Sequence, residues 1–258
     1  MFRKNAYLCG GFKDHIDLRS LIIDIGNTAV KAAWADGIVL GRIFRYQGER
    51  VRNFILSLCE KEHPSLMVIS SVYEISRQDE DVYRSVCGRL LILDQAHPDV
   101  LKASGIPGWV TYDRAASIVA ARHLFSGKGC VIMDLGTTMS VDVVNADGTW
   151  SGGNVSLGCR TRFKALNRYS RALPLIDTPA DAPLLGRSFD ESVASGVISG
   201  IMFEIEGYVS SFPGHIIVFT GGDANYFAKR MKNSIFVVCN LVLMGLALIA
   251  DGYADEVD

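Results

Sequence analysis

This 258-residue sequence lacks the features of several broad protein classes. Its most apolar stretch, Ile235–Ala250, is shorter than a membrane-spanning helix requires and contains Asn240. The five histidines form no pair at metal-ligand spacing, which argues against a zinc site. Residues 1–20 contain no apolar core of the kind that a secretory signal carries, so we expect an N-terminal extension before the first strand.

The sequence also lacks Cys-x-x-Cys motifs and an excess of basic or acidic residues. The six cysteines include no Cys-x-x-Cys pair and several lie in apolar segments, so we expect buried free thiols in a reducing cytoplasm. The 26 basic and 28 acidic residues are nearly balanced and the basic ones are scattered, which gives no reason to expect nucleic acid as a partner. Hydrophobic residues make up 49%, as in folded proteins, and the length fits two domains of roughly 100–150 residues.

The segment Leu21–Lys31 combines a predicted strand with groups that can bind phosphate. Its first residues form a short apolar run, which is typical of a buried strand, before Asp24 introduces a charge. Gly26 lets a ligand approach the backbone because it has no Cβ. Turn amides, the Thr28 hydroxyl and the Lys31 ammonium can donate to phosphate oxygens. The candidate phosphate-binding residues are therefore Asp24, Gly26, Asn27, Thr28 and Lys31.

Asp24 fits such a site only if a divalent cation or its water shell lies between the carboxylate and the phosphate. The simpler alternative is an ordinary hairpin turn, with Lys31 as an edge-strand lysine that blocks aggregation.

A second copy of this pattern lies in Ile132–Thr138. It repeats the order apolar-Asp-x-Gly-x-Thr around Asp134, and an Asp-Gly turn follows each copy, at Asp36-Gly37 and Asp147-Gly148. One repeat at this long spacing indicates a duplicated domain and not a solenoid. Two such hairpins predict a nucleotide held in a cleft between two related halves. Both copies resemble the actin-like superfamily of sugar kinases and Hsp70 ATPases, whose fold is ribonuclease H-like.

The expected elements follow that α/β fold, with two mixed-sheet domains at 21–112 and 113–258 after the extension 1–20. In the first half we expect strands at Leu21–Asp24, Val30–Ala35, Val39–Arg45, Leu66–Ile69 and Leu90–Leu93, and helices at Val51–Cys59 and Asp79–Cys87. In the second half we expect strands at Val131–Asp134, Ser140–Val144, Thr149–Val155, Ile216–Phe219 and Ile235–Val238. The helices expected there are Asp113–Phe125, Gly158–Leu173, Asp190–Ser211, Asn225–Lys232 and Leu241–Ala250.

Asp113 and Arg114 are candidates for acid–base chemistry and acceptor binding. Phosphoryl transfer needs a group that accepts the proton of the attacking hydroxyl, and Asp113 is a candidate base. Arg114 could hold the carboxylate of an acidic acceptor through two parallel hydrogen bonds. The alternative is a helix cap at Asp113 followed by a surface charge.

Several motifs together resemble type III pantothenate kinase, and their order holds from about Leu21 to Ala250. They are Asp24-Ile25-Gly26-Asn27-Thr28-Ala29-Val30-Lys31, Ser70-Ser71-Val72, Asp113-Arg114, Asp134-Leu135-Gly136-Thr137, Gly152-Gly153, Ala172-Leu173-Pro174 and Thr220-Gly221-Gly222-Asp223. The resemblance implies ATP-dependent phosphorylation of pantothenate, the first step of coenzyme A synthesis. It also implies Mg²⁺, a monovalent cation (potassium or ammonium), and a homodimer with acceptor sites at the subunit interface.

The resemblance also implies roles for individual residues. The segment Asp24–Lys31 would line the ATP phosphates and Asp113 would be the base. Asp134 would bind the monovalent cation, and Thr137 would contact ATP. Gly221-Gly222 matches the place where the superfamily binds adenosine, although any strand-to-helix turn can use two glycines.

The chain departs from the family pattern around the acceptor. Thr111 replaces the glycine of Gly-x-Asp-Arg, Ser104 replaces a tyrosine that contacts pantothenate, and Phe189 replaces a threonine that reaches the neighbouring acceptor site. Ser156 replaces the proline of a glycine-rich loop. Three hypotheses follow: a type III pantothenate kinase, a non-catalytic relative that binds nucleotide or regulates a partner, and a kinase for another small hydroxyl compound.

Overall fold

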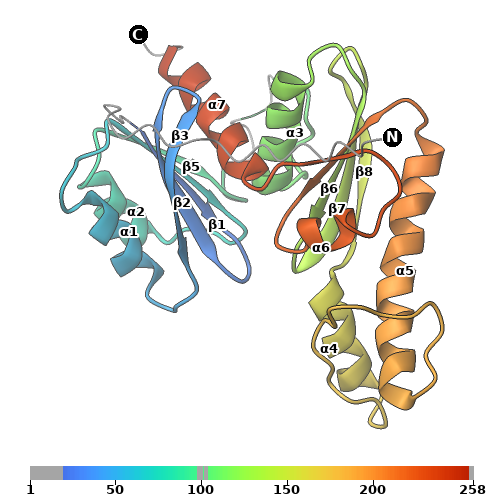
Figure 1. Cartoon of the computed structure of the whole chain (residues 1–258). Helices are drawn as coiled ribbons and strands as arrows, with labels where there is room; N and C mark the ends of the chain where they lie inside the picture. The colour runs from blue at the N-terminus through green and yellow to red at the C-terminus, as the bar shows by residue number, and fades with distance from the viewer. Residues whose placement is uncertain (1–19, 98–100, 102–103, 256–258) are drawn as a thin grey trace. The chain divides into compact units, whose positions relative to one another are not determined.

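The computed structural model describes residues 20–97, 101 and 104–255, which form two compact units (Figure 1). Among these residues, the N-terminal unit contains 20–124 and 240–255, and the C-terminal unit contains 125–239. The expected extension lies outside the described residues except for Ser20, which begins the first strand.

The N-terminal unit contains a five-stranded mixed sheet in the order β3-β2-β1-β4-β5. Strands β1, β2 and β3 are antiparallel neighbours, whereas β1, β4 and β5 run parallel. The elements are β1 (Ser20–Ile25), β2 (Val30–Asp36), β3 (Val39–Tyr46), α1 (Val51–Cys59), β4 (Leu66–Ser71), α2 (Arg77–Arg84), β5 (Arg89–Leu93), α3 (Tyr112–Leu124) and α7 (Leu241–Asp255).

Each face of this sheet buries its own apolar core, because successive side chains of a strand point to opposite faces. Leu21, Ile23 and Ile25 pack with α1 and α2 on one face. Ile22 packs with α3 and α7 on the other face (Figure 1). β1 is therefore the buried centre of the unit, as its apolar run predicted.

The C-terminal unit repeats this topology in the order β10-β9-β6-β7-β8. β6 pairs antiparallel with β7 and parallel with β9, as β1 does with β2 and β4. The duplicated fold predicted from the two aspartate motifs is thus confirmed. The elements are β6 (Cys130–Leu135), β7 (Thr138–Val144), β8 (Trp150–Leu157), α4 (Cys159–Tyr169), α5 (Phe189–Ser211), β9 (Ile216–Thr220), α6 (Ala224–Ala228) and β10 (Ile235–Val237).

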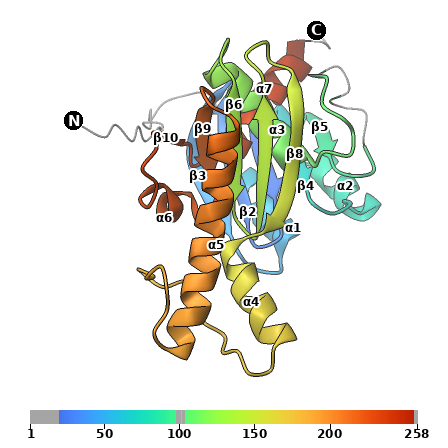
Figure 2. The ribbon, with the colours of Figure 1, turned by 90° about the vertical axis from the view of Figure 1, so that its right-hand side faces the viewer.

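Helices α4 and α5 lie side by side and extend past the end of the C-terminal sheet (Figure 2). One apolar face of α5 packs into the core of its own unit, where Val193, Val197, Ile201 and Ile205 are buried. A pattern of this kind on a long helix could also favour an interface with a second subunit, but this face is already covered and is not available for one. Other apolar side chains of this pair of helices are exposed.

Several boundaries differ from those expected. α4 ends at Tyr169, before Leu173, because Ser170 has an extended backbone. α6 is shorter than expected and α7 is longer. α3, from Asp113 onward, and α7 lie after the expected boundary in sequence, but by their contacts they belong to the N-terminal unit, because they pack on each other and on one face of that sheet. The expected division between 112 and 113 reflects sequence order and stays a prediction.

Candidate active site

Asp24 lies near the end of β1, opposite the lysine predicted to join it in binding phosphate. It pairs with Lys31 on β2 and with Ser70 on β4. The alternation of side chains places Asp24 on the same face as Ile22, which α3 and α7 cover. Side chains directly opposite on antiparallel strands lie about 4.5–5.5 Å apart at Cβ. The register therefore makes Asp24, which is 9% exposed, and Lys31 cross-strand neighbours on the same face of the sheet.

The turn after β1 presents polar groups outward. The Gly26 amide donates to the Ala29 carbonyl at 3.1 Å, which closes the turn. A Cβ on Gly26 would lie 3.4 Å from that carbonyl oxygen, which is an ordinary contact distance, so the turn itself does not require a glycine there. Asn27 and Thr28 are exposed between these residues. This geometry fits a phosphate-binding turn.

The first turn of α3 contains Asp113 and Arg114. The helix begins at Tyr112, and the Thr111 carbonyl accepts the first helical hydrogen bond from Ala115 at 2.9 Å. Asp113 is therefore inside the first turn and is not the cap, although its carboxylate accepts the Arg114 amide at 2.9 Å. Arg114 is only 9% exposed, so it is not the surface charge of the simpler reading.

Asp24 and Asp113 belong to one unit. Asp24 pairs with Ser70, and Ser70 pairs with Leu93, so β1, β4 and β5 end together at one edge of the sheet. α3 covers the face on which Asp24 lies. The N-terminal unit thus contains the predicted phosphate turn, the candidate base and Arg114.

In the C-terminal unit, Gly221 lies against the Asp134 carboxylate. Gly221 has a φ of +90°, and a Cβ there would lie 2.4 Å from the Asp134 Oδ1 and 2.5 Å from the Leu135 carbonyl oxygen. The Asp223 amide donates to that carbonyl at 2.9 Å. The structure therefore brings Gly221 together with Asp134.

The start of α4 holds Thr137 in place. The Thr137 carbonyl accepts hydrogen bonds from the Gly158 amide at 3.1 Å and from the Thr161 hydroxyl at 2.6 Å. A Cβ on Gly158 would lie 1.9 Å from the Gly136 carbonyl oxygen, so only glycine fits there. Sequence reasoning missed Thr161, since a threonine inside a helix carries no pattern that marks it.

Phe189 begins α5 in the C-terminal unit, where it is 56% exposed. The other predicted acceptor residues, Thr111, Asp113 and Arg114, belong to the N-terminal unit. The predicted acceptor residues are therefore divided between the two units.

Burial raises the pKa values of several ionisable groups in the two units. Burial raises the pKa of Asp223, which follows Gly222. Burial also raises the pKa of Cys130, which begins β6, to about 11, and raises that of Cys59 to about 11. These thiols are protonated at neutral pH and are poor nucleophiles, so they are not candidates for covalent catalysis.

The residues present fit the expected cations. The described part of the chain contains no group of three or more His, Cys, Asp and Glu side chains arranged to hold a metal. Mg²⁺ does not need such a group, because it keeps several waters and binds through one or two carboxylates and substrate phosphates. At Asp134, a Cβ on Gly221 would collide with both the carboxylate Oδ1 and the Leu135 carbonyl oxygen, so these two oxygen atoms lie near each other, and oxygen atoms are the ligands that hard cations prefer.

A cavity of about 440 Å³ lies on the opposite face of the N-terminal sheet, beside α1 and α2. Ile25, Arg50, Tyr73 and Ile75 are among its lining residues, but the candidate phosphate-binding residues Asp24, Gly26, Asn27, Thr28 and Lys31 are not. An ion pair between Arg52 and Asp79 occupies its wall. We therefore do not assign the nucleotide or the acceptor to this cavity.

Comparison with solved structures supports the fold. The structure resembles a Baf family transcriptional activator from Campylobacter jejuni with a TM-score of 0.61, at 17% identity over 91% of this chain and 99% of that one. It also resembles an activator of 2-hydroxyisocaproyl-CoA dehydratase from Clostridium difficile with a TM-score of 0.56, at 12% identity over 92% and 96%. Among the residues that these coordinates describe, no helix is long and apolar enough to cross a membrane.

Comparison with known sequences is more specific. A type III pantothenate kinase from Phocaeicola vulgatus is 33% identical over 88% of this chain and 96% of its own length. The type III pantothenate kinase of Cytophaga hutchinsonii is 32% identical over 88% and 96%. The family model for type III pantothenate kinase matches residues 20–211. The duplicated fold, the paired aspartate motifs and these matches show that the chain belongs to the type III pantothenate kinase family.

Proposed function

We propose that this protein transfers the γ-phosphoryl group of ATP to pantothenate, giving 4′-phosphopantothenate in the first step of coenzyme A synthesis. The observation that carries the proposal is the pairing of Asp24 with Lys31 on the sheet face covered by α3, whose first turn contains Asp113 and Arg114. Family membership supplies the reaction class.

On the nucleotide side, Lys31 and the turn of Gly26, Asn27 and Thr28 donate to phosphate oxygens. Asp24 holds the Mg²⁺ side of the phosphates, where the cation neutralises charge when bound. In the C-terminal unit, Thr137 and Gly221-Gly222 contact the nucleotide. The bonds from Gly158 and Thr161 fix Thr137 for that contact.

On the acceptor side, the oxygen of the pantothenate hydroxyl attacks the γ-phosphorus, and ADP leaves. Asp113 accepts the proton of that hydroxyl. Arg114 is held in a buried position and binds the pantothenate carboxylate. Thr111 and Phe189 shape the acceptor pocket. Their replacement of a glycine and a threonine changes the volume of that pocket but leaves the base and Arg114 in place.

Asp134 binds the monovalent cation, potassium or ammonium, together with the Leu135 carbonyl. Support comes from Gly221, whose backbone lies so close to both oxygen atoms that a Cβ would overlap them, which places the two oxygens near each other. The cation balances negative charge close to the nucleotide.

We further propose a cytoplasmic homodimer. Support comes from exposed apolar side chains on α4, on α5 and in the loop between them, which a second subunit would cover. They are Leu166, Tyr169, Leu175, Leu184, Leu185, Phe189 and Phe203. The free thiols of Cys59, Cys87, Cys130 and Cys159 are in keeping with a reducing cytoplasm.

Turnover of ATP by the purified protein, with and without pantothenate and in potassium, ammonium or sodium buffer, tests the proposal. We expect ADP and 4′-phosphopantothenate in equal amounts, and faster turnover in potassium or ammonium. Binding of ATP without pantothenate-dependent turnover in any buffer would refute the kinase assignment. A regulatory relative or a kinase for another hydroxyl compound would then be the better reading.

A further inference from the structure

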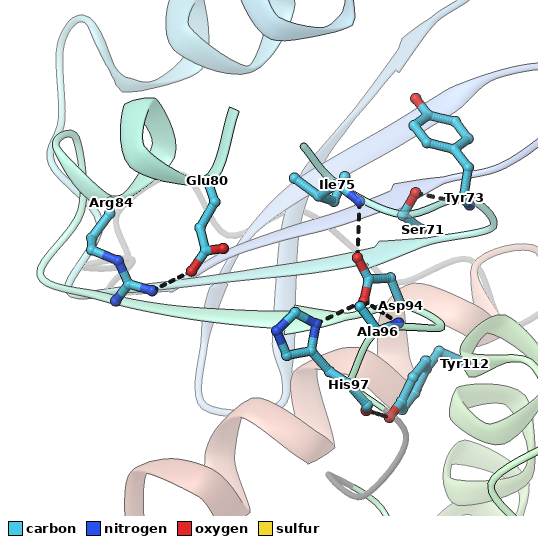
Figure 3. A network of polar contacts seen from close by, with 9 residues as sticks. All are labelled: Ser71, Tyr73, Ile75, Glu80, Arg84, Asp94, Ala96, His97 and Tyr112. Atoms are coloured by element: carbon cyan, nitrogen blue, oxygen red, sulfur yellow. Dashed lines mark hydrogen bonds and ion pairs between the residues drawn. The ribbon is translucent and has the colours of Figure 1, made fainter. Parts of the chain in front are cut away.

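A buried carboxylate joins three segments at the edge of the N-terminal sheet where the parallel strands end. Asp94 directly follows β5, and its side chain is fully buried. Its Oδ2 accepts the Ile75 amide at 2.9 Å, and its Oδ1 accepts the Ala96 amide at 3.0 Å (Figure 3). The His97 Nδ1 lies 2.7 Å from the same Oδ1. An ionised carboxylate can only accept, so His97 carries its proton on Nδ1 in this arrangement.

The network continues from His97 to α3. The Tyr112 hydroxyl donates to the His97 carbonyl, as Figure 3 shows. Tyr112 is the first residue of α3 and directly precedes Asp113. The segment after β5 is thereby tied to the start of the helix that contains the proposed base.

On its other side, the network reaches the end of β1. Ile75 belongs to the segment that follows β4, and the Val72 amide of that segment donates to the Ile25 carbonyl at 3.1 Å. Ile25 is the last residue of β1 and directly precedes the proposed phosphate turn. Asp94 therefore lies between the end of β1 and the start of α3, with hydrogen bonds toward each.

Resting on the function proposed above, we infer that Asp94 and Tyr112 are positioning residues for phosphoryl transfer. They fix Asp113 relative to the phosphate turn, which must stay aligned for the acceptor oxygen to approach the γ-phosphorus. Displacement of a reacting group by about 1 Å can lower a rate by about a hundredfold. A buried carboxylate with three donors is suited to hold such an alignment, because leaving any donor without a partner is unfavourable.

The test is Tyr112→Phe, which removes the hydroxyl but keeps the ring. One neutral hydrogen bond contributes about 0.5–1.5 kcal/mol, so we expect kcat/KM for pantothenate to fall about two- to tenfold. The dissociation constant of ATP should stay the same. Tyr253→Phe is the matched control, because Tyr253 packs on the same core from α7 and should leave both quantities unchanged. Asp94→Asn, which preserves volume but loses acceptor capacity, should lower kcat/KM for pantothenate further than Tyr112→Phe.

Hydrogen exchange supplies a readout that does not depend on activity. Tyr112→Phe should speed exchange of the amides at 112–116, and Tyr253→Phe should not. An inactive wild-type protein would refute the proposed function, and the exchange rates would still decide the inference. Unchanged exchange at 112–116 would overturn it. The inference would also be overturned if Tyr112→Phe and Tyr253→Phe changed kcat/KM for pantothenate equally. A fall in the ATP affinity of Tyr112→Phe as large as its fall in pantothenate turnover would overturn it too.

Discussion

Gly221→Ala tests the geometry around Asp134 most directly. Two effects coincide at this residue: the backbone has a φ of +90°, and a Cβ would lie 2.4 Å from the Asp134 Oδ1 and 2.5 Å from the Leu135 carbonyl oxygen. The Leu135 carbonyl is backbone and cannot turn aside, and the other obstacle is the end of the short Asp134 side chain on the central strand. The methyl group must therefore displace the oxygens that we assign to the cation.

The two effects have separate magnitudes. A left-handed backbone conformation costs a non-glycine residue about 1–2 kcal/mol. Forcing a methyl group into a filled space costs typically about 1–3 kcal/mol more. The sum of about 2–5 kcal/mol corresponds to a fall in Tm of at least about 4 °C, at about 2 °C per kcal/mol for a chain of this size.

Gly214→Ala separates these effects. Gly214 belongs to the same unit and has a φ of +84°, but nothing lies within 4 Å of a Cβ there. Thermal unfolding of the two variants without ligands should show a smaller loss of Tm for Gly214→Ala, and the difference measures the overlap at Asp134. Gly221→Ala should also raise the potassium concentration needed for half-maximal turnover, whereas Gly214→Ala should not. Equal Tm values for the two variants, with unchanged potassium dependence, would refute this account of Asp134.

Three further outcomes are expected. Asp113→Asn should lower kcat at least about a hundredfold, because a general base contributes about that much. The affinity for ATP should change little, because the base touches only the acceptor. Steady-state kinetics and calorimetry measure these two quantities, and near-normal turnover would exclude Asp113 as the base. Asp134→Asn should abolish activation by potassium, and normal activation would make the cation assignment wrong. Light scattering should find a dimer, and a monomeric wild-type protein would contradict the proposal. Phe203 is exposed on α5, so Phe203→Glu should dissociate the dimer and Phe203→Leu should preserve it.

The two central strands could be predicted from sequence because their signals are local. Each is an apolar run that an aspartate interrupts near its end, and Gly26 or Gly136 follows. Periodicity also predicted α1 to the residue and most strands within one or two residues. The close approach of Gly221 to Asp134 was not predicted, because neither a glycine pair nor a single aspartate is specific alone.

The remaining features depend on contacts between distant segments. Nothing near Asp94 in sequence indicates that its carboxylate is buried, because its Ile75 partner comes from the segment after another strand. The apolar face of α5 has the same pattern whether its own unit or a second subunit covers it. Its burial against β6 and β7 could be learned only from the structure. Arg114 is a similar case, since a basic residue in a first helical turn is usually exposed.

The duplication also explains how two equivalent aspartates can take different ligands. Asp24 and Asp134 occupy the same place on β1 and β6, and each has a buried hydroxyl residue on the parallel neighbour, Ser70 or Thr220. The antiparallel neighbour differs, since Asp24 faces Lys31 and Asp134 faces Ser140. Lys31 adds a positive charge that attracts phosphate oxygens, whereas the Ser140 hydroxyl is neutral and can turn its oxygen toward a cation. The proposed roles of Asp24 at magnesium-bound phosphate and of Asp134 at a monovalent cation agree with this difference, which is confined to one position on the neighbouring strand.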